Sequence, residues 1–178
     1  GNDTVPGSAY IYRGGSSMDG AADVTLVGVD LGSFFGYSVS DAGDINGDGY
    51  ADVIVGAYRL GSYTGRAYIY LGGSTMSTTP AAIITGTMSY DYLGRSVACA
   101  GDVNKDGFAD VIIGSFGYNN STGRADIFFG AAEWDNTADV TLAGEVLNNF
   151  FGRLVASAGD VNYDGYDDVI VGAPHYNS

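Results

Sequence analysis

The sequence predicts an all-β fold, and three observations support this prediction. The chain of 178 residues contains 29 glycines and only 3 prolines. Its apolar stretches are short, rich in β-branched residues and bounded by glycine, which is typical of strands joined by tight turns. No stretch has the periodicity of an amphipathic helix. The composition is too apolar and aromatic for a disordered chain, and the length allows one domain with a core.

An internal repeat organises these short strands. An acidic motif begins at Asp44, Asp102 and Asp160, so the repeat has a period of 58 residues, and its copies align without a gap. Each period contains about four strand-like segments; in the first copy they include 38–43 and the run Val53-Ile54-Val55. Four strands per repeat is the sequence mark of a β-propeller blade. The prediction is therefore a β-propeller of four-stranded antiparallel blades.

The phase of the repeat divides the chain unevenly. We expect residues 1–178 to form a single domain with three blades' worth of strands, in which the first and last blades are split. The expected units are a half-blade at 8–28, blades at 35–86 and 93–144, and a half-blade at 151–173.

The acidic motif reads D-x-N-x-D-G-x-x-D, and in the first copy it runs from Asp44 to Asp52. Oxygen side chains at positions one, three, five and nine can converge if the loop curls. Gly49 at position six permits the sharp turn, and the carbonyl of Tyr50 at position seven can face inward. Ligation by oxygen alone favours Ca²⁺ over zinc or copper. The threefold motif therefore predicts three Ca²⁺ per chain.

The motif has two alternative interpretations. An EF-hand needs a bidentate glutamate at position twelve, where this chain has Val55, Ile113 and Val171, so that class is excluded. A surface turn rich in Asp and Asn that binds no ion would produce a similar pattern. Three copies in strict register favour calcium over this alternative.

Charge and targeting signals narrow the function. The net charge is −14, and Lys105 is the only lysine, which argues against nucleic acid as a partner. No apolar run reaches transmembrane length, so we expect no membrane insertion. The sequence has neither an initiator methionine nor a signal peptide, which suggests a processed chain or an excised piece. Cys99 has no disulfide partner in the chain, and we expect a buried spectator.

The combination of Phe35-Gly36, the acidic loop and Gly172-Ala173-Pro174 resembles the FG-GAP repeats of integrin α-subunit propellers and their bacterial and archaeal relatives. The resemblance covers nearly the whole chain. It implies a calcium loop between the first two strands of each blade and an extracellular or cell-surface location. Leu93 replaces the phenylalanine of the second copy, and only the third copy keeps the proline. Integrin propellers have seven blades, whereas this chain holds material for three.

The resemblance also implies the ligands of each loop, at positions one, three, five, seven (through the carbonyl) and nine. They are Asp44, Asn46, Asp48, Tyr50 and Asp52; Asp102, Asn104, Asp106, Phe108 and Asp110; and Asp160, Asn162, Asp164, Tyr166 and Asp168.

Three classes of function follow. The favoured one is a non-catalytic, calcium-stabilised extracellular scaffold for adhesion or assembly. The alternative is a lectin-like module that binds carbohydrate or protein through tyrosines, although the same tyrosines could simply pack between blades: Tyr37, Tyr58, Tyr63, Tyr90, Tyr92 and Tyr118. An enzyme is disfavoured, because His175 is the only histidine and has no counterpart in the other repeats.

The split blades predict homo-oligomers. Two copies could close a six-bladed ring, or a head-to-tail joint that does not close could give a strand-exchanged filament. A piece cut from a seven-bladed parent is the third possibility. Asn2, Asn119 and Asn120 match the pattern of glycosylation acceptors.

Overall fold

The structure is a computed structural model that describes residues 5–175. Within this range the fold is all-β, which confirms the expected class, with twelve strands and one four-residue helical segment. The elements are β1 (Ser8–Ile11), β2 (Val24–Val27), β3 (Ser38–Gly43), β4 (Asp52–Ala57), β5 (Arg66–Tyr70), β6 (Ala82–Thr85), β7 (Ser96–Gly101), β8 (Asp110–Ser115), α1 (Tyr118–Ser121), β9 (Arg124–Phe128), β10 (Val140–Ala143), β11 (Leu154–Gly159) and β12 (Asp168–Gly172).

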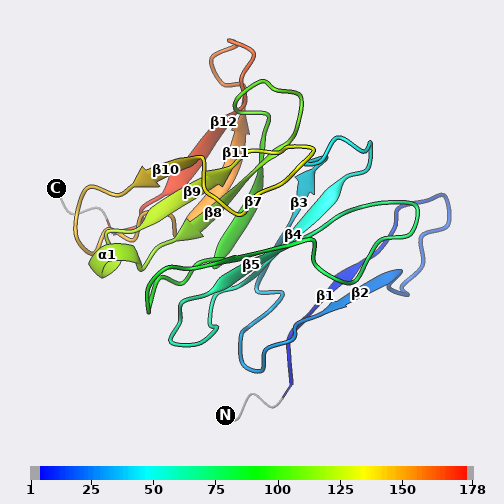
Figure 1. Cartoon of the computed structure of the whole chain (residues 1–178), viewed down its shortest axis with the longest axis horizontal. Helices are drawn as coiled ribbons and strands as arrows, with labels where there is room; N and C mark the ends of the chain where they lie inside the picture. Colours follow the sequence, from blue (N-terminus) through cyan, green and yellow to red (C-terminus); the bar gives the residue numbers. More distant parts are fainter. Residues whose placement is uncertain (1–4, 176–178) are drawn as a thin grey trace.

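The strands form four antiparallel sheets in chain order. Strands β3 to β6 make one four-stranded sheet and β7 to β10 make another, while β1–β2 and β11–β12 form two-stranded sheets. Figure 1 shows these sheets following one another through the molecule, with β1–β2 at one end and β11–β12 at the other. Each four-stranded sheet has the topology expected of a propeller blade.

A glycine bulge ends the first strand of three of the four sheets, namely β3, β7 and β11. The pairing register shifts between Asp41 and Gly43, and the same shift recurs at Gly101 and Gly159. Gly43 has a φ of 69°, in the left-handed region that glycine adopts without strain. The bulge therefore turns the chain out of the sheet and into the acidic loop.

The Phe-Gly segment joins neighbouring sheets. Gly65 and Leu93 form an isolated parallel bridge between β5 and the start of the next sheet, and Gly123 and Phe151 repeat it. Gly94 has a φ of 80°, and a Cβ there would overlap the carbonyl oxygen of Arg66. Close approach of the two sheets therefore requires glycine at this position.

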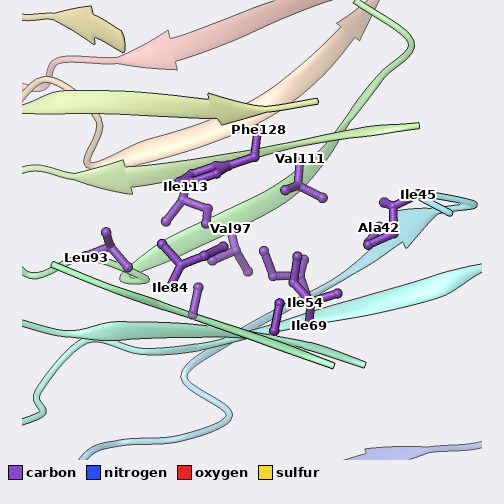
Figure 2. Close-up of a cluster of buried hydrophobic side chains, with 12 residues drawn as sticks. Ala42, Ile45, Ile54, Ile69, Ile84, Leu93, Val97, Val111, Ile113 and Phe128 are labelled. Atoms are coloured by element: carbon purple, nitrogen blue, oxygen red, sulfur yellow. The ribbon is translucent and has the colours of Figure 1, made fainter. Parts of the chain in front are cut away.

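The core lies between successive sheets. Figure 2 shows the cluster in which Ile54 and Ile69 of one sheet meet Val97, Val111 and Ile113 of the next. The remaining clusters lie between β1–β2 and the first four-stranded sheet, and between the second four-stranded sheet and β11–β12. Apolar residues thus face neighbouring sheets on both sides of a blade, which explains the continuous apolar runs of β4 and β8.

Two local features complete the description. Segment α1 is a single turn in which Asn119 and Asn120 have left-handed backbone conformations, so it does not alter the all-β class. Among the described residues, no helix has the length and apolarity needed to cross a membrane.

Candidate functional site: three acidic loops

Each acidic loop is wound around its first aspartate. In the first loop, Asp44 Oδ1 accepts hydrogen bonds from the N–H groups of Gly47 (2.8 Å) and Asp48 (3.1 Å), and Oδ2 accepts one from Gly49 (2.8 Å). The strand β3 delivers Asp44, and the positive φ of Gly47 and Gly49 lets the following residues curl back over its carboxylate. One side chain therefore fixes the course of the whole loop.

The second and third loops repeat this arrangement. Asp102 accepts from Asp106 at 3.1 Å and from Gly107 at 3.0 Å. Asp160 accepts from the corresponding residues, Asp164 at 3.0 Å and Gly165 at 2.8 Å. All three loops connect the first and second strands of their sheets, as the sequence predicts, and in Figure 1 they lie on the same side of the molecule.

The residues at positions three and five of each loop are hydrogen-bonded to each other. Asn46 donates from Nδ2 to Asp48 Oδ2 at 3.1 Å and accepts from the Asp48 N–H at 3.0 Å. The equivalent amide–carboxylate contacts measure 2.7 Å for Asn104 and 2.8 Å for Asn162. The structure thus brings positions one, three and five together in every copy.

Position seven contributes its backbone. The N–H of Tyr50 donates to Asp48 Oδ1 at 2.9 Å, and Phe108 and Tyr166 repeat this bond in their loops. The side chains of Tyr50 and Tyr166 remain exposed. Any role in ion binding therefore belongs to the carbonyl group, which agrees with the tolerance of both Tyr and Phe here.

The aspartate at position nine lies at the buried base of the loop. Asp52 is fully buried; its Oδ2 accepts from the Ile45 N–H at 3.0 Å and its Oδ1 from the Gly72 N–H at 2.7 Å. Asp110 is held in the same way by Val103 and Gly130. A carboxylate oxygen can accept more than one hydrogen bond or ligand, so these bonds leave capacity for a cation.

Asp168 differs from its two counterparts. It is only partly buried, and Oδ2 accepts from the Val161 N–H at 2.9 Å. The glycine donors of the first two loops lie just after the third strand of the blade, and the corresponding glycine of the N-terminal half-blade is Gly14. Sequence reasoning missed this second anchor of position nine, although the recurrence of glycine at 14, 72 and 130 signals it.

The electrostatics at position nine of the first two loops disfavour the ionised carboxylate. The pKa of the Asp110 carboxyl is raised to about 6, chiefly by burial; its N–H donors oppose the shift, and the charges of Asp106 and Asp102 add to it. Burial also raises the pKa of Asp52, with smaller contributions from the charges of Asp48 and Asp44. The first loop has no basic residue to offset these charges. A bound cation would supply that compensation.

The donor set fits a hard cation in its chemistry. Every predicted side-chain ligand offers a carboxylate or amide oxygen, which are the groups that Ca²⁺ binds. Across residues 5–175, however, no three His, Cys, Asp or Glu side chains are grouped as ready metal ligands. The ligand sets, the identity of the ion and the number of three per chain therefore remain predictions.

The loops are also linked to one another across blades. The N–H of Ala109 in the second loop donates to the Asp44 carbonyl at 3.0 Å, and that of Asp167 donates to the Asp102 carbonyl at 3.2 Å. The third loop additionally faces Lys105, whose Nζ lies 5.2 Å from the centre of the Tyr166 ring. Neighbouring loops thus share backbone contacts that the repeat pattern alone does not reveal.

An aromatic surface occupies the opposite ends of the strands. Its residues lie in the loops between second and third strands and between successive sheets. The rings of Tyr37 and Tyr58 are 4.5 Å apart, and those of Tyr63 and Tyr92 are 5.4 Å apart. The Arg95 guanidinium lies 4.8 Å from the Tyr37 ring centre. Many of the predicted tyrosines therefore contact one another between blades, although Tyr37 and Tyr90 stay exposed.

The remaining residues singled out in the sequence have ordinary surroundings. His175 packs edge-on against the Phe150 ring at 4.8 Å. Cys99 is half-buried, and burial raises the pKa of its thiol, which suits an inert side chain. Asn119 and Asn120 are exposed, whereas Asn2 lies outside the described residues.

Comparisons with known proteins agree with this geometry. A model of FG-GAP-like repeats matches residues 44–113, and a model of the FG-GAP repeat matches residues 151–178. The chain is 38% identical to integrin alpha-5 of Xenopus laevis over 96 residues, which cover 49% of this chain and 9% of that protein. It is 29% identical to integrin alpha-8 of Mus musculus over 109 residues, which cover 55% of this chain and 10% of that protein.

The fold and the repeated loops define a protein built of β-propeller blades, and the matches specify its kind: the chain belongs to the FG-GAP repeat family, with integrin α-subunits among its relatives. It spans about a tenth of the length of these curated relatives.

Proposed function

We propose that this chain is a calcium-stabilised, non-catalytic domain of an extracellular or cell-surface scaffold for adhesion or assembly. The family supports this role, because the matched relatives are integrin α-subunits and FG-GAP repeats of that kind are associated with divalent cations. The observation that carries the proposal is the threefold acidic loop, in which three acidic side chains share one small loop around a common hydrogen-bond pattern.

In this proposal, calcium acts on folding. Each loop connects the first two strands of its sheet, so an ion bound there joins strands whose ends carry mutually repelling carboxylates. Calcium that binds only the folded state stabilises it by about 1.4 kcal/mol per site when free calcium is tenfold above the dissociation constant. Three sites together would contribute roughly 4 kcal/mol, a large share of the stability of about 5–15 kcal/mol that is usual for a domain.

Metal analysis and thermal unfolding test this proposal. Equilibrium dialysis against buffered calcium should find about three bound equivalents per chain, and EDTA should lower the melting temperature strongly. Asp48→Asn keeps an oxygen that can accept the Tyr50 hydrogen bond but removes one charge, so it should weaken calcium binding at one loop. Glu133→Gln, which changes an exposed carboxylate outside the loops, is the matched control. Fewer than two equivalents and an unchanged melting curve in EDTA would show that the loops are only turns.

A second candidate function uses the aromatic surface. A hollow of about 490 Å³ there is lined by Tyr90, Tyr92, Asn119 and Asn120 among others, which combines rings with amide groups as a sugar or peptide site does. Glycan and peptide arrays would identify a ligand. Tyr90→Ala should then abolish binding, whereas Tyr163→Ala, at a 95% exposed tyrosine in the third acidic loop, should not.

A further inference from the structure

An apolar pocket lies beside β1, next to the cluster that joins β1–β2 to the sheet that follows it. Its volume is about 300 Å³, and its apolar lining comes from β1, β2, β3 and β4. The residues that matter here are Ile11, Leu26, Val39, Val53 and Val55.

One repeat later, the same five positions are part of a filled core. They are Ile69, Ile84, Val97, Val111 and Ile113, and together with Ile54 they belong to the cluster in Figure 2. Ile54 is completely buried there. The pocket therefore has the walls of this core cluster but lacks the isoleucine that the second strand of a blade provides.

The missing isoleucine is present at the other end of the chain. Strand β12 and its following residue read Asp168-Val-Ile-Val-Gly-Ala173, identical to Asp52-Val-Ile-Val-Gly-Ala57 of β4. Ile170 corresponds to Ile54, yet 60% of its surface is exposed. One chain therefore contains both an exposed isoleucine and a pocket at the position where a whole blade buries the equivalent isoleucine.

The surfaces around these two features are exposed in the same complementary way. Tyr10 on the open edge of β1 is 57% exposed, whereas its repeat partner Tyr68 is 2% exposed. Val39, on the face of β3 toward the pocket, is 59% exposed, against 4% for Val97. Residues that are buried within or beside a four-stranded blade are therefore exposed within or beside the two-stranded one.

We propose that strands β11 and β12 of one copy add to β1 and β2 of a second copy, completing a four-stranded blade. The pairing of β4 with β5 defines the register: Ile54 lies opposite Ile69, and Gly56 opposite Ala67. By repeat equivalence, Ile170 pairs with Ile11 of the second copy, and Gly172 with its Ala9. Ile170 then occupies the pocket of the second copy.

A polar contact completes this joint. In both whole blades the position-nine aspartate accepts the N–H of a glycine after the third strand, at 2.7 Å for Gly72 and 2.8 Å for Gly130. The equivalent donor is Gly14, which follows β1, and the equivalent acceptor is Asp168. The joint therefore also supplies the second anchor of the third acidic loop.

The same joint formed twice closes a ring. Each copy has two whole blades and two halves, so two copies make six blades, within the range of about 4–8 that propellers have. Between whole and half-blade in one chain, the Ser96 hydroxyl accepts a hydrogen bond from the Val155 N–H at 3.1 Å. Leu154 occupies the position of Ser96 in the third repeat. In the joint, Leu154 therefore contacts Val39 of the second copy in place of that hydrogen bond. The inference concerns assembly and does not depend on the proposed calcium role.

Light scattering with the 178-residue chain in saturating calcium tests the proposal. At micromolar concentration the mass should be twice the 18.4 kDa of one chain. A longer head-to-tail polymer would also support the joint, since it uses the same surfaces without closure. A compact monomer at about 100 μM would overturn the proposal and leave these surfaces to flanking repeats of a longer chain.

Gly172→Ala separates assembly from folding. A Cβ at the equivalent Gly56 or Gly114 would overlap a carbonyl oxygen of the next blade, at Gly94 or Gly152, whereas at Gly172 it meets only Leu154 at 3.6 Å. In the joint it would meet Gly36 of the second copy. The variant should fold normally but dissociate roughly 10- to 100-fold more readily per joint. Gly20→Ala, where a Cβ has open space, is the control.

Hydroxyl-radical labelling gives an independent measurement. Tyr10 and Tyr12 should be protected in the assembled protein and labelled in Gly172→Ala, as their exposures of 57% and 46% in the single chain require. A dimer that Gly172→Ala and Ile170→Ala leave unchanged, with both tyrosines still labelled, would show that copies associate through another surface.

Discussion

Strands β4 and β12 have the same sequence in different surroundings. In β4, Ile54 is fully buried between two sheets, whereas in β12, Ile170 is 60% exposed. Asp52 has two backbone donors, and Asp168 has one among the described hydrogen bonds. Both segments pair with a preceding strand and follow an acidic loop of the same pattern. Local sequence therefore determines strand and loop, while the second anchor depends on the next strand of the blade and burial also depends on the following sheet.

The largest expected difference between the two strands lies in their isoleucines. Ile54→Ala should cost about 3–4 kcal/mol of unfolding free energy, because it leaves a cavity in a closely packed cluster. Ile170→Ala should cost less than about 0.5 kcal/mol in a single chain, because most of the side chain is already in water. Denaturant unfolding in the Gly172→Ala background, where the joint is blocked, measures both values. Equal losses would contradict the comparison.

The glycines of the two strands should differ nearly as much. Gly56→Ala introduces a Cβ into the carbonyl oxygen of Gly94, and we expect a loss of about 1–3 kcal/mol. Gly172→Ala should leave the stability of the single chain unchanged within about 0.5 kcal/mol. Thermal unfolding at a protein concentration low enough to prevent assembly compares the two. If Gly172→Ala were as harmful as Gly56→Ala in the monomer, it could not serve to separate folding from assembly.

Stability at alkaline pH should depend on a buried tyrosine of the first whole blade. Burial raises the pKa of Tyr70 to about 12. The unfolded chain releases the Tyr70 proton near pH 10 and the folded chain retains it, so stability should fall as pH rises from about 10 to 12. Tyr70→Phe should reduce this fall. Melting temperatures measured from pH 8 to 11.5 in the Gly172→Ala background test this, and an equal fall in the Tyr70→Phe variant would contradict it.

The smallest expected difference concerns the acidic loops themselves. Lys105 places an ammonium group near the third loop, and the pKa of Asp164 there is lowered by hydrogen bonds from Tyr166 and Asn162 and, to a smaller extent, by the Lys105 charge. This charge opposes a divalent cation. Lys105→Met should therefore raise calcium affinity at one site a few-fold, an effect that salt screens. Calcium titration calorimetry can measure this change in affinity, with Arg13→Met as a control. An unchanged affinity at low ionic strength would show that the Lys105 charge does not affect the site.

The strands were predictable because the three copies of the repeat can be aligned with one another. Three copies at a fixed spacing indicate which segments are strand and which are loop, and the described strands fall within the expected segments, whereas the bulges were not predicted. The acidic loops were also predictable from their residue types. The hydrogen bonds that Asp44 accepts come from its own loop and need no distant partner.

Which of these equivalent residues are buried depends on the packing of neighbouring strands and sheets. The identical hexapeptides at 52–57 and 168–173 have different exposure because, among the described residues, a third strand and a following sheet cover only the first of them. The link between loops from Ala109 to Asp44 and the matching of the pocket to Ile170 likewise depend on how neighbouring sheets stack. Burial and contact between blades are set by segments roughly one repeat apart, and no local pattern of residues encodes them.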